Sequence, residues 1–70
     1  MDADQELIGK VAQTTSEIAA GEMGEVMVPI RGGSESYYAY CDDPAETVPR
    51  GARVLVLEQQ APRTLIVSRF

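Results

Sequence analysis

The feature that most constrains this chain is a set of five short apolar segments separated by turns that contain glycine or proline. In the clearest of them Val26, Val28 and Ile30 alternate, so they share one face of an extended chain. Short segments recurring every roughly 10 to 14 residues are typical of β-sandwiches and barrels. The expected strands are 8–15, 25–31, 36–41, 53–58 and 64–69. We predict an all-β fold, and so short a chain favours a closed barrel.

The first of these segments has an alternative assignment, an α-helix over residues 7–20. The alanine pair at 19–20 favours the helix, whereas Gly9 and the threonine pair at 14–15 disfavour it. Residues 1–6 are polar and acidic and are expected to form a flexible lead-in, followed by a single domain at 7–70.

Three turn signals place the strands along the chain. Gly32 and Gly33 predict a hairpin, because glycine accepts a positive φ angle. Pro49 and Gly51 predict a tight turn, with proline second and glycine fourth. Pro29 cannot donate a hydrogen bond to a neighbouring strand, so it predicts a sheet edge or a bulge.

The composition excludes several kinds of function. The 70 residues include 11 acidic and 6 basic side chains, and the net charge of −5 disfavours nucleic acid. The chain has no histidine, which is the commonest general base and metal ligand. Its serines lack a nucleophile motif, and only a dyad with Lys10 stays open on paper. We therefore expect no enzyme activity, no metal and no cofactor.

No segment is apolar for the roughly 20 residues that a membrane span requires. The acidic start at Met1 to Asp4 does not resemble a signal peptide. Cys41 is the one cysteine, so no disulfide forms within the chain, and its alternation with Tyr37 and Ala39 predicts a buried, unreactive thiol.

Charged residues form two groups. Asp42, Asp43 and Glu46 lack the spacing of a calcium loop, so we interpret them as a solvated turn. The other group is arginine, and a solvated surface with ion pairs is the simpler interpretation. Arg53 and Arg69 would then pair across strands with Glu58, and contact with anionic lipid headgroups is the alternative. The members of the arginine group are Arg50, Arg53, Arg63 and Arg69.

Aromatic and aliphatic side chains on the outer face give the candidate site. Alternation places them opposite the residues that fill the barrel, and an exposed apolar stripe often marks a protein contact. The candidate partner-binding residues are Tyr38, Tyr40, Leu55, Leu57 and Ile66. Two alternatives stay open. In the first, either Leu7 with Ile8 or Phe70 folds over the stripe and covers it. In the second, the two tyrosines stack on single-stranded nucleic acid.

Several short motifs resemble the C-terminal soluble domain of the NfeD-like family. They are a first strand led by glycine, an aromatic-x-Ala third strand, and the approach hydrophobic-Pro-x-Gly-x-x-Val-x-Val to the fourth. The segments that carry them are 8–12, 24–28, 37–39, 48–56 and 64–67. The turn at residues 32–35 looks longer than in the family, which leaves the start of the third strand open.

The resemblance implies a five-stranded OB-fold barrel whose parent protein is anchored in a membrane, with this domain soluble on the cytoplasmic side. It implies a non-catalytic protein-interaction domain that acts with stomatin- or flotillin-like scaffold proteins in membrane protein quality control or organisation, or that self-associates. A single-strand nucleic-acid module and an accessory domain of a membrane-associated serine protease are the alternatives. The family supplies no catalytic residue for this chain.

Overall fold

The computed structural model describes residues 7–70, and their regular structure is entirely β-strand. The expected lead-in at 1–6 lies outside the described residues. The strands are β1 (Val11–Ser16), β2 (Gly24–Ile30), β3 (Gly33–Cys41), β4 (Arg53–Ala61) and β5 (Thr64–Arg69). The helix alternative for residues 7–20 is wrong. β1 starts later than expected because Leu7, Ile8 and Gly9 form a turn, in which Gly9 has φ of 87°.

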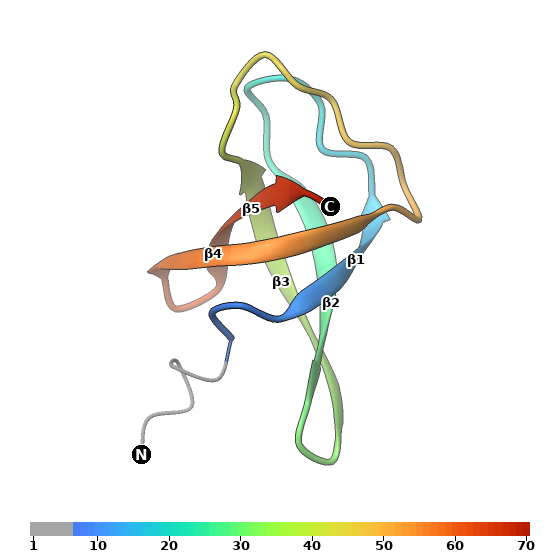
Figure 1. Ribbon diagram of the computed structural model, residues 1–70, viewed down its shortest axis with the longest axis vertical. Helices are drawn as coiled ribbons and strands as arrows, with labels where there is room; N and C mark the ends of the chain where they lie inside the picture. Colours follow the sequence, from blue (N-terminus) through green and yellow to red (C-terminus); the bar gives the residue numbers. More distant parts are fainter. Residues whose placement is uncertain (1–6) are drawn as a thin grey trace.

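The strands close into a barrel in the order β1-β2-β3-β5-β4, with β4 returning to pair with β1 (Figure 1). β3 and β5 run parallel, and the other neighbouring pairs are antiparallel. Closure pairs backbone N–H and C=O groups that would otherwise stay unpaired at the two edges of an open sheet. The predicted five-stranded OB-type barrel is confirmed.

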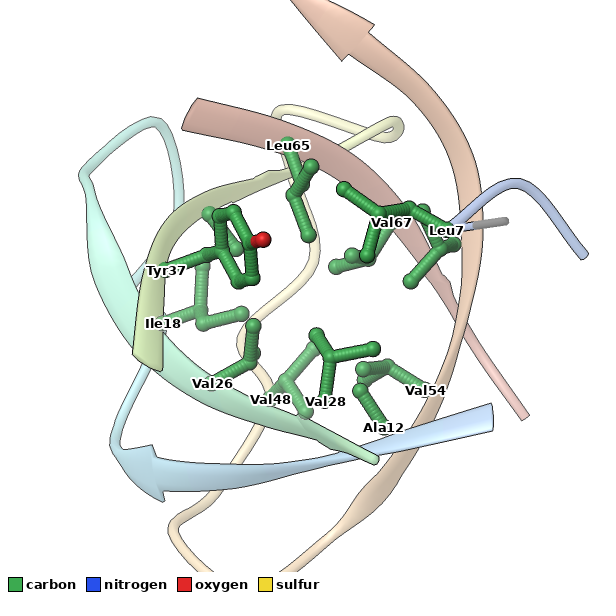
Figure 2. Packing of buried hydrophobic residues seen from close by; sticks show 12 residues of the cluster. Leu7, Ala12, Ile18, Val26, Val28, Tyr37, Val48, Val54, Leu65 and Val67 are labelled. Atoms are coloured by element: carbon green, nitrogen blue, oxygen red, sulfur yellow. The ribbon is translucent and has the colours of Figure 1, made fainter. Parts of the chain in front are cut away.

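Alternation along the strands fills the barrel. Each strand sends every second side chain inward, and most of these are fully buried (Figure 2). The core consists of Leu7, Ala12, Ile18, Val26, Val28, Tyr37, Ala39, Val48, Val54, Val56, Leu65 and Val67. Ile18 and Val48 come from the two long connections rather than from strands. They exchange backbone hydrogen bonds of 2.8 and 2.9 Å, which tie these connections together.

The turn before β4 is held by the hydroxyl of Thr14 on β1. Thr14 Oγ1 donates to Pro49 O at 2.7 Å and accepts from Ala52 N at 2.9 Å. Arg50 and Gly51 are the central turn residues, and Gly51 has φ of 83°. Proline is therefore the first residue of the turn and glycine the third, whereas the prediction placed them second and fourth. The glycine is third because this turn type needs a positive φ angle at its third residue.

The β2–β3 hairpin is tighter than predicted. Ile30 pairs with Gly33, so Arg31 and Gly32 form a two-residue turn in which Gly32 has φ of 85°. β3 consequently begins three residues before the expected start at 36. The polar residues 34–36 gave no strand signal, yet their backbone continues the ladder with β2.

The tip of this hairpin projects beyond the barrel (Figure 1), and its two edges are closed by basic side chains. β1 pairs with β2 no further than Met27, and beyond it Lys10 Nζ donates to Pro29 O at 2.7 Å. On the other edge, Arg63 Nη2 donates to Ser36 O at 2.6 Å. Pro29 thus lies at a strand edge, as predicted, and the edge offers no free N–H there.

β4 also runs past its expected end at residue 58 and reaches Ala61. The register shifts between Val56 and Glu58, and again between Gln59 and Ala61. Such bulges let a strand bend while it continues to pair. The predicted five-residue loop therefore shrinks to a turn at Pro62 and Arg63. None of residues 7–70 belongs to a helix long and apolar enough to cross a membrane.

Candidate partner-binding surface

The structure brings three of the five candidate residues into one line across the outer face of β3, β5 and β4. Tyr40 is the register partner of Ile66. Ile66 faces Glu58 on β4, and the bulge places Leu57 beside Glu58. We call Tyr40, Ile66 and Leu57 the outer apolar line. The line does not depend on the bulge, because a regular antiparallel register continued from Val56 and Val67 already puts Leu57 opposite Ile66. The bulge adds Glu58 at that position.

The other two candidates extend this line at opposite ends. Leu55 lies two residues before Leu57 on the same face of β4 and pairs with Val11 of β1. Tyr38 lies two residues before Tyr40 and pairs with Glu25 and Thr64. Val11 is 37% exposed and was not among the predicted site residues. Its alternation with the inward-facing Ala12 and Thr14 is the sequence signal that would have placed it outside.

Exposure differs among the candidates. Tyr38 is 50% exposed and Leu57 38%, whereas Tyr40, Leu55 and Ile66 are half-buried. The expected cover does not lie over them. Leu7 is part of the barrel core, and Phe70 is 71% exposed, so it buries little against any surface. Within residues 7–70 the stripe is therefore partly exposed, most of all at Tyr38 and Leu57.

Among residues 7–70 two arginines take part in ion pairs, as the favoured interpretation expected, but neither pairs with Glu58. Arg69 lies 3.6 Å from Glu46, and Arg63 lies 3.3 Å from Glu35. The guanidinium of Arg63 also lies 4.8 Å from the centre of the Tyr37 ring. Pairing with Glu58 is wrong for these strands, because Glu58 faces Ile66 across the ladder rather than a cation. The two carboxylates and the two guanidinium groups of these ion pairs are all partly exposed, so each pair contributes less than about 1 kcal/mol to the stability of the fold.

The acidic loop after β3 forms a turn, not a ligand cage. Asp43 Oδ1 accepts a hydrogen bond from Ala45 N at 3.0 Å, and Glu46 faces Arg69. Asp42 and Asp43 are exposed. Among residues 7–70, no group of three or more metal-ligating side chains is close enough to hold an ion.

Cys41 lies at the end of β3 and packs against the core. Burial raises the pKa of its thiol, and the carboxylates of Asp42 and Glu46 raise it further. A hydrogen bond with the backbone of Asp43 lowers the pKa and offsets part of this increase. Its Sγ lies 3.7 Å from Asp42 Oδ1. The thiol therefore stays protonated at neutral pH, which makes it a poor nucleophile.

This shift predicts slow alkylation of Cys41. At about pH 8 iodoacetamide should react several-fold more slowly with the folded domain than with the urea-unfolded chain, because the thiolate is the reactive form. The pH of half-maximal rate should be higher in the folded state, and Asp42→Asn should lower it. Because the pKa of Cys41 is higher in the folded state, its protonated thiol contributes stability that is fully present below the pKa of the unfolded chain. This contribution is lost as the pH rises through the pKa of the folded state. A folded-state midpoint at or below the unfolded one would contradict this assignment.

Most of the chain matches one known family. The model of the NfeD C-terminal domain family matches residues 8–68. This chain belongs to the NfeD C-terminal domain family. The predicted resemblance is confirmed, although no curated protein sequence matches the chain.

Solved NfeD domains have the same fold. The soluble domain of the NfeD protein YuaF from Bacillus subtilis is 25% identical, with a TM-score of 0.77 over 91% of this chain and 74% of that one. The C-terminal domain of the stomatin operon partner protein 1510-C from Pyrococcus horikoshii is 26% identical, with a TM-score of 0.70 over 100% and 97%. The soluble domain of a Corynebacterium glutamicum membrane protein implicated in regulation of membrane protease activity is 24% identical, with a TM-score of 0.69 over 96% and 97%, and supports the fold alone.

Proposed function

We propose that this NfeD C-terminal domain is a non-catalytic protein-interaction module of a membrane-anchored parent protein. It acts on the cytoplasmic side with a stomatin- or flotillin-like scaffold protein in membrane protein quality control or organisation. The observation that carries the proposal is the outer apolar line, which stays uncovered by the described residues. The similar domain from Pyrococcus horikoshii belongs to a stomatin operon partner protein, which supports this class of partner.

The surroundings of the tyrosines favour protein over nucleic acid. The acidic Glu25 stands directly across the ladder from Tyr38. The hollow beside Tyr38 has a volume of only about 110 Å³, and its basic residue, Arg63, is already paired with Glu35. A stacking platform for single strands combines aromatic rings with unpaired cations. An accessory role beside a membrane protease would use the same outer apolar line.

Capture of the partner tests the proposal. The immobilised domain should retain the stomatin- or flotillin-like protein of the same organism, and Leu57→Asp with Tyr38→Ala should lower the retained amount at least about tenfold, as for central contact residues. Leu57 and Tyr38 are the most exposed members of the surface, so the fold tolerates these changes.

The matched control is Met23→Asp, since Met23 is 47% exposed in the connection between β1 and β2, outside the outer apolar line. It should retain the partner as the wild type does. Retention that is equal in all variants would remove this surface from the proposal. Retention lost equally in the Met23→Asp control would point to loss of folding or to a different face.

A further inference from the structure

A groove lies on another face of the barrel, where β1 and β2 diverge beyond the pairing of Gln13 with Met27. Its volume is about 300 Å³, at the lower limit of cavities that hold ligands. The described residues that line it are Val11, Ala12, Gln13, Met27, Pro29, Ser34 and Arg53. It thus joins four strands and is separate from the outer apolar line.

The floor of the groove is apolar. Met27 is 36% and Val11 37% exposed, and the ring of Pro29 is also open to solvent. Pro29 has no N–H to offer, and Lys10 Nζ already occupies its carbonyl oxygen. A bound chain is therefore recognised through its side chains and not as an added strand of the sheet.

The rim of the groove is basic. Arg53 lines it, Lys10 Nζ donates to the carbonyl oxygen of the lining residue Pro29, and Arg31 begins the hairpin turn two residues after Pro29. Arg50 lies in the turn that Gln13 Nε2 contacts, through Gly51 O at 3.3 Å.

Lys10, Arg31, Arg50 and Arg53 have no carboxylate within 4.0 Å in the part of the chain that the structure describes. The ion pairs found there are formed by Arg63 and Arg69. The groove's described lining contains no acidic residue. In a chain with a net charge of −5, this apolar groove therefore has Arg53 in its lining and Lys10 at its edge, both without a carboxylate within 4.0 Å among the described residues.

We propose that this groove binds an extended acidic segment of a protein partner. Aliphatic side chains of the segment contact Val11 and Met27, and its carboxylates pair with Arg53 and Arg31. This site goes beyond the proposed function, because none of its lining residues belongs to the outer apolar line. The described residues that line the groove include no aromatic ring on which nucleobases could stack, which disfavours nucleic acid as the ligand. The concave shape of the groove and the negative net charge of the chain disfavour binding to a flat anionic bilayer.

Titration of the ¹⁵N-labelled chain tests the site. The probe is a decapeptide that alternates glutamate with leucine, and the matched peptide carries lysine in place of glutamate. We expect the acidic probe to shift the amide signals of Val11, Met27 and Arg53, with a Kd on the order of 100 μM at low salt. Raising the salt from about 0.05 to about 0.5 M should weaken binding roughly tenfold, because these exposed charges are screened. The lysine peptide should not bind.

Variants and competing ligands decide the outcome. Met27→Asp and Arg53→Glu should each weaken binding about tenfold, whereas Leu57→Asp and Arg69→Glu, matched in chemistry on other faces, should leave it unchanged. Dispersed spectra establish that each variant is folded. The proposal is overturned if the acidic probe causes no shifts, if the shifts map to Tyr40 and Ile66, or if Leu57→Asp weakens binding equally. It is also overturned if oligo-dT or phosphatidylserine vesicles shift the groove signals and the acidic probe does not.

Discussion

Thr14→Val is expected to lower the free energy of unfolding by about 3 kcal/mol. Thr14 is 2% exposed, and its hydroxyl completes the turn before β4 by bonding to both Pro49 O and Ala52 N. Valine has the same shape but leaves both backbone groups without their partner in a part-buried turn, which costs about 1–3 kcal/mol for each group. For a domain of this size, whose total stability is roughly 4–10 kcal/mol, this is a large share.

Urea denaturation followed by circular dichroism measures the effect. Thr14→Ser keeps the hydroxyl and should lose only about 1 kcal/mol, from the missing methyl group. Thr15→Val is the matched control, because Thr15 is the exposed neighbour on β1 and should change stability by less than about 0.5 kcal/mol. If Thr14→Ser destabilises the domain as much as Thr14→Val, packing and not hydrogen bonding explains the position.

Gly24→Ala is expected to destabilise the domain by about 3 kcal/mol through steric overlap. Gly24 begins β2 and is buried. A Cβ atom there would lie 2.5 Å from Cγ1 of Ile18 and 2.7 Å from the carbonyl oxygen of Glu17. Ile18 is fully buried and its backbone pairs with Val48, so neither neighbour moves away without disturbing the core.

Gly32→Ala separates overlap from backbone strain. Gly32 has φ of 85° but nothing lies within 4 Å of its added Cβ, so alanine there should cost only about 1 kcal/mol. Thermal unfolding of both variants, with the wild type, measures the contrast. A Gly24→Ala variant more stable than Gly32→Ala would mean that the approach of Ile18 to β2 is looser than the structure shows.

The strand positions with regular alternation were predictable from the sequence. Val26 and Val28, and Leu65 and Val67, fill the barrel as their period of two indicates. β5 matches its expected range, because Pro62 marks the preceding turn and four of its residues are apolar or β-branched. The start of β3 was missed because residues 33–36 are polar or glycine and join the sheet only through pairing with β2.

The candidate site was only partly predictable. Alternation placed Tyr38, Tyr40, Leu55 and Ile66 outside the barrel, but their arrangement depends on which strands become neighbours. Alternation also placed Leu57 outside, and the parallel pairing of β3 with β5 and the antiparallel pairing of β5 with β4 bring Tyr40, Ile66 and Leu57 together. The role of Thr14 and the basic groove were also missed, since their components lie on β1, β2 and the turn before β4, far apart in the chain.

The sequence by itself therefore determined the all-β class, the faces of the regular strands and the family, because alternation and turn chemistry are local properties. The strand order of the barrel, the clash that keeps Gly24 a glycine, the hydroxyl bridge of Thr14 and the approach of Lys10 and Arg53 to one groove were decided only by the tertiary structure. Each of these depends on distances between residues that are remote in sequence, and such distances exist only once the barrel has closed.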